Sequence, residues 1–348
     1  MSFLGDHDNT KLKNLIACNE CEAIALAVGY YLATHKVGVV YMQNSGLGKC
    51  VNPLTSICDP EIYSIPILLL IGWRGEPGKI DAVQHKKMGK ITLPLLDTLQ
   101  IPYSIVEPDL LKIENELEKA WLHFTKTKGP YAFIFKKNLF DEYKPNKRRL
   151  NEFELTRTTA INLIMENLNN EEIIVSSTGY LSRELFEYRE SRRKDHYKSF
   201  YNIGGMGCAS SIGLGIALQK PDKRVLVFDG DGSILMQMGA FSTIGRYSPS
   251  NLVHIIFDNN AHESTGGQQT NSNFVDFLKI ADACSYKTVK FIKTAEELIK
   301  SMKNLSKMEG PILILIKISL TLNSNLKRPN KEPTEFKKDL MRHLLPLK

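Results

Sequence analysis

Long hydrophobic runs are absent from the sequence, and so is a secretory signal. The longest apolar stretch lies around Ile65–Trp73, whereas a helix needs about 20 apolar residues to cross a bilayer. The first residues, Met1–Asp8, show no basic start followed by an apolar block. We therefore expect a cytoplasmic protein that has no membrane partner.

Cysteine is scarce, with 6 residues in 348, and their spacing is not typical of a disulfide framework. Cys18 and Cys21 form a Cys-x-x-Cys pair, but a structural zinc site needs a second pair with short spacing. Cys50 and Cys58 are a poor match for that second pair. We expect reduced thiols that hold no metal.

Motifs for binding nucleic acids and nucleotides are also missing. The net charge is +7, but the basic residues are dispersed, and their one local cluster, Lys144–Arg149, falls where we expect a linker. There is no Gly-x₄-Gly-Lys-Ser/Thr motif, and Gly213-x-Gly215 is not completed to a dinucleotide-binding fingerprint. We expect no nucleic-acid partner. The positive charge indicates either a solvated lysine-rich surface or a field that attracts anionic substrates.

Short apolar, β-branched runs alternate with helical patterns along the chain. In the first half the expected strands are Val37–Asn44, Ile65–Gly72, Pro102–Val106 and Tyr131–Phe135, and the expected helices are Glu20–His35 and Leu110–Thr125. In the second half the expected strands are Glu172–Ser176, Arg224–Asp229, Leu252–Asp258, Lys287–Phe291 and Pro311–Ile318, and the expected helices are Gly207–Gln219, Ile234–Arg246 and Ala295–Leu305. This alternation predicts an α/β protein with doubly wound parallel sheets, each covered by helices on both faces.

A polar stretch, Lys137–Asn151, interrupts this rhythm and is typical of a connection between domains. We predict a first domain at residues 1–140, a linker at 141–155 and a second domain at 156–348. Ligands of such sheets bind at the carboxyl ends of the strands, so the polar residues at these ends are the candidate site.

The turn Gly230-Asp231-Gly232-Ser233 follows one expected strand and opens a helix. Glycines at such a turn let the backbone approach a diphosphate, and a helix N-terminus favours its negative charge. Asp231 supplies a hard oxygen ligand for Mg²⁺. Asn259, at the end of the next strand, supplies a neutral ligand, and the carbonyl of Ala261 supplies another. Two diphosphate oxygens and a water complete an octahedron.

A Gly-Asp-Gly turn followed by an asparagine at the end of the next strand resembles the signature of thiamine-diphosphate-dependent enzymes. Asn259 stands 28 positions after Asp231, close to the usual spacing of that family. The resemblance implies thiamine diphosphate and Mg²⁺ as cofactors. It also implies that Met206, in the segment that begins at Gly204, supports the bent cofactor by packing, a role that suits a core methionine as well.

The same family has a glutamate at the start of a helix in its first domain, followed by small residues and Gly-Tyr. Glu20 matches it here, upstream of Gly29 and Tyr30. Such a carboxylate assists the cofactor to lose a proton, and help of this type contributes about 10²–10⁴-fold. Glu22 is the competing residue, because either carboxylate also suits a helix N-terminus. The distance to Gly29 favours Glu20.

Three further strings resemble the phosphonopyruvate decarboxylases, and the sulfopyruvate decarboxylases closely after them. These strings are Tyr41–Gly48 with Asn52–Thr55, Gly72–Gly78 with Asp81, Gln84 and His85, and Asp258–Gln268. The resemblance implies decarboxylation of 3-phosphonopyruvate to phosphonoacetaldehyde and CO₂. It also implies a homodimer or a larger homo-oligomer with active sites between subunits.

A dianionic head group explains the polar residues of these strings. Asn44 and Ser45 offer hydrogen-bond donors after a strand, Arg74 offers positive charge and Gln84 a neutral donor. Arg74 is equally suited to a structural ion pair. His85 and His262 are the candidate proton donors. His85 also suits an ordinary loop position, and His262 a hydrogen bond to the site.

Several positions depart from the family pattern. The residues Met1–His7 align within the first helix of the family's first domain, so we expect that its first strand and an active-site loop are lacking. Lys49, Cys50 and Cys208 are unusual at their positions, and Lys49 adjoins the expected substrate loop. Two alternatives therefore remain, a sulfopyruvate decarboxylase and a truncated homologue without turnover.

Overall fold

The computed structural model describes residues 14–141, 153–320, 326 and 331–345. The predictions for Met1–His7 and for the basic cluster Lys144–Arg149 therefore lie outside the described residues. The chain divides into two compact units at Lys144 and Pro145. We call Leu15–Lys144 the amino-terminal unit and Pro145–Lys348 the carboxy-terminal unit, and each is described by itself.

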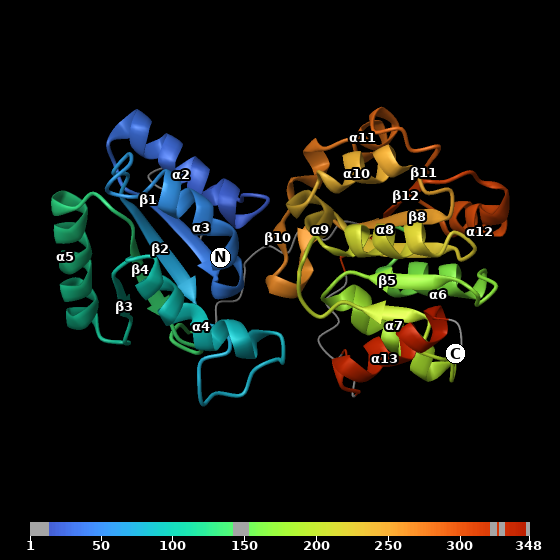
Figure 1. The fold of residues 1–348 in the computed structure, drawn as a ribbon, viewed down its shortest axis with the longest axis horizontal. Helices are drawn as coiled ribbons and strands as arrows, with labels where there is room; N and C mark the ends of the chain where they lie inside the picture. The colour runs from blue at the N-terminus through green and yellow to red at the C-terminus, as the bar shows by residue number, and fades with distance from the viewer. Residues whose placement is uncertain (1–13, 142–152, 321–325, 327–330, 346–348) are drawn as a thin grey trace. The chain divides into compact units, whose positions relative to one another are not determined.

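The described part of the amino-terminal unit contains a parallel sheet of four strands in the order β1-β2-β4-β3 (Figure 1). The strands are β1 (Gly38–Gln43), β2 (Ile67–Gly72), β3 (Tyr103–Ile105) and β4 (Tyr131–Phe135). Its helices are α2 (Glu20–Thr34), α3 (Leu47–Ser56), α4 (His85–Thr98) and α5 (Leu110–Lys126), with a short 3₁₀ turn, η1 (Asn44–Gly46). Helices α2, α3 and α4 bury one face of the sheet, and α5 packs against the other. The sheet is therefore doubly wound.

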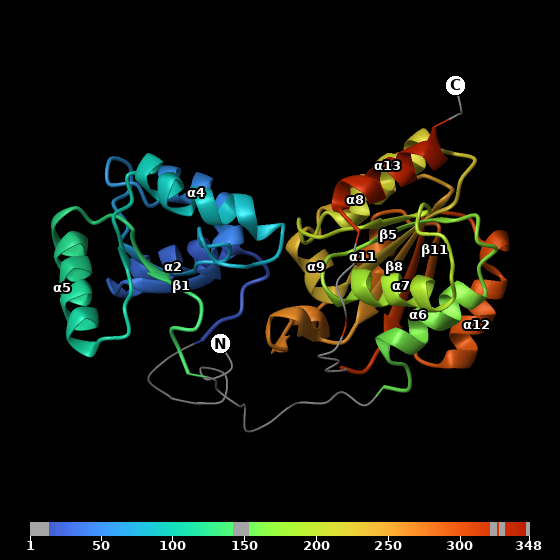
Figure 2. The ribbon, with the colours of Figure 1, turned by 90° about the horizontal axis from the view of Figure 1, so that it is seen from below.

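The carboxy-terminal unit contains a parallel sheet of six strands in the order β11-β12-β8-β7-β5-β6. Strands β11, β8 and β5 are labelled in Figure 2. Its strands are β5 (Ile173–Ser176), β6 (Ser199–Tyr201), β7 (Val225–Gly230), β8 (Leu252–Asp258), β11 (Thr288–Ile292) and β12 (Ile312–Lys317). A separate hairpin pairs β9 (Ala261–His262) with β10 (Gln268–Gln269). The predicted α/β class with two parallel sheets is confirmed.

Helices flank this six-stranded sheet and bury its apolar strands. They are α6 (Arg157–Glu166), α7 (Tyr180–Ser191), α8 (Ala209–Gln219), α9 (Asp231–Met236), α10 (Ala240–Tyr247), α11 (Phe277–Ala283), α12 (Ala295–Lys303) and α13 (Pro333–Leu344), with 3₁₀ turns η2 (Glu263–Thr265), η3 (Asn271–Phe274) and η4 (Leu305–Lys307). Side chains of α6, α7 and α12 share one core with β7, β8 and β12. The central strands β7 and β8 are buried along nearly their whole length, which leaves only their ends for polar chemistry.

The predicted single helix Ile234–Arg246 is wrong, because the chain forms two helices there. Gln237 has φ −140° and ψ 47°, outside the helical region, and α10 begins only after Gly239. Helices α3 and α4 were not predicted at all. Each contains a proline, Pro53 or Pro94, and a proline inside a segment normally favours a break.

Candidate active site

The carboxyl end of β7 delivers Asp231 and Ser233 into one buried turn. The strand ends at Gly230 and α9 begins at Asp231, which is 2% exposed. The hydroxyl of Thr270 donates a hydrogen bond to Asp231 Oδ2. Ser233 Oγ accepts a hydrogen bond from the backbone N–H of Gly207 at 3.0 Å and one from Ser177 Oγ at 3.0 Å. The predicted glycine turn is thus held in place by neighbouring loops.

Two glycines of this region have no room for a side chain. A Cβ added to Gly232 would lie 2.5 Å from His262 Nδ1. One added to Gly207, whose φ is +90°, would lie 2.6 Å from Gln237 Cγ. Glycine at these two positions therefore lets His262 and Gln237 pack directly against the backbone of the turn.

The end of β8 places Asp258 and Asn259 beside that turn. Asp258 is 1% exposed and forms an ion pair with Lys317 at 2.5 Å. Asn259 Oδ1 accepts a hydrogen bond from the backbone N–H of Ala261 at 3.0 Å. Burial and the nearby carboxylate of Asp258 raise the pKa of Asp231 to about 7. A bound cation would offset this cost of ionising Asp231.

The donor set suits Mg²⁺ better than a transition metal. Among the described residues there is no cluster of three or more His, Cys, Asp or Glu side chains that would hold a metal ion. A cation at the predicted position would instead meet the carboxylate of Asp231, the amide of Asn259 and the carbonyl of Ala261. Oxygen ligands with few charges, completed by phosphate oxygens and water, are the usual environment of Mg²⁺.

A buried ion-pair network that the sequence did not reveal adjoins Asn259. Arg157 donates to Glu184 and to Glu263, at 2.5 Å in each case. Glu263 also accepts a hydrogen bond from Asn259 Nδ2 at 2.9 Å. Burial raises the pKa of Glu263, and the guanidinium of Arg157 opposes that shift. These residues lie far apart in the sequence, so no local pattern signalled the network.

These side chains share one cavity of the carboxy-terminal unit. It is lined by Arg157, Ser177, Thr178, Tyr180, Leu181, Met206, Gly230, Asp231, Gly232, Ser233, Phe257, Asn259, Ala261, His262, Glu263, Ser264 and Ile318. Of the residues predicted for this half of the chain, Gly204 alone is not in the lining; its N–H donates to Asn202 Oδ1 at 3.4 Å. Burial lowers the pKa of His262, so its imidazole is neutral at pH 7.

In the amino-terminal unit, Glu20 is the first residue of α2 and lies against Gly46. Its Oε2 is buried and has no hydrogen-bond partner among the described residues. Glu22 is exposed, and its carboxylate accepts a hydrogen bond from the backbone N–H of Cys18 at 2.6 Å. The two carboxylates thus differ, because Glu22 accepts a hydrogen bond at the start of the helix and Glu20 has an oxygen without a partner.

Asn44, which the sequence predicts as a substrate ligand, is hydrogen-bonded inside the amino-terminal unit. The side chain is fully buried. Its Nδ2 donates to the carbonyl of Arg74 at 2.8 Å and to Thr92 Oγ1 at 2.9 Å, and its Oδ1 accepts from the N–H of Arg74 at 3.1 Å. Both amide hydrogens are therefore used within this unit. Ser45 is exposed and donates to Gln43 Oε1 at 2.7 Å.

The loop after β2 carries Arg74 and is folded against the start of α4. Arg74 forms a two-pronged ion pair with Asp81, at 2.7 Å and 2.5 Å, and its side chain is still 38% exposed. Gly75 has φ +70° and no room for a Cβ beside the backbone of His85. Gln84 is exposed and His85, the first residue of α4, is half-buried. The ion pair expected as the alternative role of Arg74 is present.

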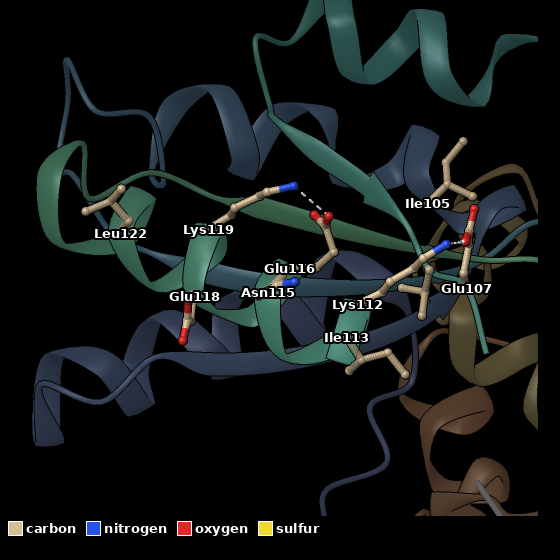
Figure 3. Close-up of a pocket in the computed structure, with 10 residues that line it drawn as sticks. Ile105, Glu107, Lys112, Ile113, Asn115, Glu116, Glu118, Lys119 and Leu122 are labelled. Carbon is tan, nitrogen blue, oxygen red and sulfur yellow. Dashed lines mark hydrogen bonds and ion pairs between the residues drawn. The ribbon is translucent and has the colours of Figure 1, made fainter. Parts of the chain in front are cut away.

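The amino-terminal unit has a hollow of its own between β3 and α5, and none of the residues predicted for the active site line it. Four of its charged side chains form two ion pairs, Lys112 with Glu107 at 2.5 Å and Lys119 with Glu116 at 2.7 Å (Figure 3). In the described part of the chain, no helix is long and apolar enough to cross a membrane.

Both halves of the chain match domains of known thiamine pyrophosphate enzymes. Residues 1–90 match the thiamine pyrophosphate enzyme N-terminal TPP binding domain, and residues 177–316 match the C-terminal TPP binding domain. The phosphonopyruvate decarboxylase of Streptomyces hygroscopicus is 36% identical over 338 residues, and that of Streptomyces viridochromogenes 33% identical over 336 residues. Both alignments cover 92% of this chain and 82% of the relative.

A third relative matches about half of the chain. The sulfopyruvate decarboxylase subunit beta of Methanococcus maripaludis is 37% identical over 188 residues, which cover 54% of this chain and 97% of that protein. The fold, the glycine turn and these matches define a thiamine-pyrophosphate-dependent enzyme. The chain belongs to the phosphonopyruvate decarboxylase family. It is a thiamine-diphosphate-dependent decarboxylase, a carboxy-lyase, which confirms the predicted class.

Proposed function

We propose that this enzyme decarboxylates 3-phosphonopyruvate to phosphonoacetaldehyde and CO₂, a step of phosphonate biosynthesis, with thiamine diphosphate and Mg²⁺. The two Streptomyces relatives named for this activity support the substrate. The observation that carries the chemistry is the buried oxygen of Glu20 that lacks a partner. A buried acceptor without a partner is costly, and the pyrimidine ring of a bound cofactor would supply the missing donor.

The carboxy-terminal unit would hold the diphosphate and the metal. The backbone of the turn at Gly230 and Gly232 and the hydroxyl of Ser233 line the cavity and would bind the phosphate oxygens. Asp231, Asn259 and the Ala261 carbonyl would ligate Mg²⁺. Met206 lines the same cavity and would pack against the cofactor, while Gly204 would shape the loop that carries it. In this arrangement Mg²⁺ would balance the negative charge of the Asp231 carboxylate.

The amino-terminal unit would activate the cofactor and receive the substrate. Thiamine diphosphate, when bound, provides the electron sink that accepts the bonding pair left by CO₂. Glu20 would hold a proton at the pyrimidine ring and thereby promote proton loss from the thiazolium carbon. Ser45, Arg74 and Gln84 would bind the anionic head group.

A proton must reach the carbon that loses CO₂, and two histidines are candidate donors. His85 opens α4 beside the Arg74 loop, and His262 lines the cofactor cavity. Burial lowers the pKa of His262, so its protonated ring would readily give up a proton and return to neutral imidazole. His85 would serve the head group or the proton transfer.

We propose that the active enzyme is a homodimer or a larger homo-oligomer. A relative that matches about half of this chain is named as one subunit of its enzyme, which supports assembly from separate chains.

Release of CO₂ and aldehyde by the purified enzyme, with both cofactors, tests the proposal on phosphonopyruvate, sulfopyruvate and pyruvate. We expect preference for phosphonopyruvate and a loss of about 10²–10⁴-fold in kcat for Glu20→Gln. Glu22→Gln is the matched control and should retain activity. Sulfopyruvate is the second candidate substrate, because a relative is named as a subunit of sulfopyruvate decarboxylase. A preference for sulfopyruvate would make it the substrate in place of phosphonopyruvate. Turnover of none of the three would refute the proposal.

A further inference from the structure

A continuous chain of hydrogen bonds in the carboxy-terminal unit ends at Asn259. Thr158 donates its hydroxyl to Glu184 at 3.0 Å, and Arg157 Nη2 donates to the other oxygen of Glu184 at 2.5 Å. Arg157 Nη1 donates to Glu263 Oε2 at 2.5 Å, and the same oxygen accepts from Asn259 Nδ2 at 2.9 Å. Apart from Thr158, each of these side chains is at most 8% exposed.

Stability alone is a weak reason for this arrangement. Removing two glutamates and an arginine from water carries a large desolvation penalty, and apolar residues of similar volume often serve a core as well or better. One arginine also leaves one of the two carboxylates uncompensated. Both features favour a role for the network in the adjoining site, which the cavity shared by Arg157, Asn259 and Glu263 supports.

The network fixes which way the amide of Asn259 faces. Glu263 Oε2 accepts from Arg157 Nη1 at 2.5 Å and from the NH₂ side of the amide at 2.9 Å, so the amide oxygen would face an acceptor if it turned over. Asn259 Oδ1 therefore points the other way, where it accepts from the N–H of Ala261 at 3.0 Å. Only an oxygen is able to ligate Mg²⁺, so the amide has one productive orientation of two. Arg157 keeps Glu263 in place through hydrogen bonds to both of its carboxylate oxygens.

We propose that Glu263, held by Arg157, is a positioning residue that keeps the oxygen of Asn259 directed at the metal. The proposal rests on the Mg²⁺ site of the proposed function. Glu263 and Arg157 touch neither substrate nor metal in this scheme. Partners of this kind, which orient a metal ligand through a hydrogen bond, typically change metal affinity 10–100-fold when they are lost.

The test measures Mg²⁺ binding by isothermal titration calorimetry at saturating thiamine diphosphate, without substrate. Glu263→Gln preserves size but lets the side-chain amide donate as well as accept, so Asn259 is free to turn over. We expect the Mg²⁺ dissociation constant to rise about 10–100-fold. Glu166→Gln is the control, because it removes the same charge from another glutamate–arginine pair, with Arg192 at 2.9 Å on the half-exposed surface, and should bind Mg²⁺ normally.

A double-mutant cycle separates orientation from a general loss of structure. In an Asn259→Asp background there is no amide to orient, so Glu263→Gln should no longer weaken Mg²⁺ binding. If the loss is as large there as in the parent protein, the positioning role is wrong. Arg157→Lys keeps the charge but loses the forked geometry, and it should weaken Mg²⁺ binding in the same direction. Thermal unfolding of every variant shows whether it is folded.

The parent protein distinguishes the two proposals. If it binds Mg²⁺ with the cofactor and Glu263→Gln binds it equally well, the positioning role alone is refuted. If the parent protein binds no Mg²⁺ in the presence of thiamine diphosphate, the metal site of the proposed function is refuted as well.

Discussion

Replacement of Gly46 by alanine would place a methyl group where the carboxylate of Glu20 now lies. The added Cβ would be 2.3 Å from both Cγ and Oε1 of Glu20. Gly46 itself has φ −82° and ψ −17°, a conformation that alanine adopts without strain. The backbone therefore accepts the substitution, and the flexible side chain of Glu20 has to move.

The size of that movement sets the expected loss. Ordinary carbon contacts lie near 3.5 Å, so the carboxylate must shift by roughly 1 Å. A misplacement of about 1 Å costs on the order of 10²-fold in rate, or about 2.7 kcal/mol in the barrier. Gly48 is the matched control, because a Cβ there meets nothing within 4 Å. Gly48→Ala should keep full activity and add about 0.5–1 kcal/mol of helix stability.

The assay follows proton loss from the thiazolium carbon of the bound cofactor by hydrogen–deuterium exchange, with acid quenching and NMR detection. It reports the step that Glu20 assists, without substrate binding or product release. Gly46→Ala should exchange about 10²-fold more slowly and unfold at nearly the parent temperature. Exchange at the parent rate in a folded Gly46→Ala variant would refute the role assigned to Glu20.

Two further predictions concern charges of the amino-terminal unit. Lys49 Nζ is buried without a partner among the described residues, so Lys49→Met should raise the free energy of unfolding by about 1–3 kcal/mol. Chemical unfolding measures this, and a lower stability would contradict it. Arg74 holds the pKa of Asp81 below its usual range, so the pair stabilises the fold above the unfolded aspartate pKa of about 3.9. Asp81→Asn should lower the free energy of unfolding by about 1 kcal/mol at pH 7, and this loss should shrink as the pH falls below about 3.9. Urea unfolding measures it, and a loss that stays constant with pH would show that the ion pair is not its source.

The strands were the most predictable part of the fold. Tyr131–Phe135 and Leu252–Asp258 form strands with the predicted bounds, because short runs of buried apolar residues have few alternatives in a parallel sheet. The break between α9 and α10 was not predictable from propensity. The break lies at Gln237, whose side chain packs beside Gly207, a residue of a loop that is distant in the sequence. Tertiary contacts of this kind override the local preference for a helix.

The site was predictable where sheet topology brings residues together. Asp231 and Asn259 follow neighbouring parallel strands, so their proximity needed only the strand assignment. Arg157 and Asn44 were different. Arg157 donates a hydrogen bond to Glu263, which lies 106 positions further along the sequence. Asn44 donates one to the backbone carbonyl of Arg74, which lies 30 positions further along. Neither contact leaves a local signature, because it depends on how loops pack after the sheets have formed.

Because Glu20 Oε2 has no partner among the described residues, the supply of thiamine diphosphate would also affect how long the enzyme survives in a cell. A ligand that binds only the folded state stabilises it by RT ln(1 + [L]/Kd), about 2.7 kcal/mol at 100 times Kd. The cofactor would satisfy an acceptor that nothing else in the described residues reaches, so its binding would suppress opening of the amino-terminal unit. Digestion by a protease, with and without thiamine diphosphate, should show this protection in the parent protein and less of it in Glu20→Gln. A cell short of thiamine would then clear the empty enzyme faster than the loaded one.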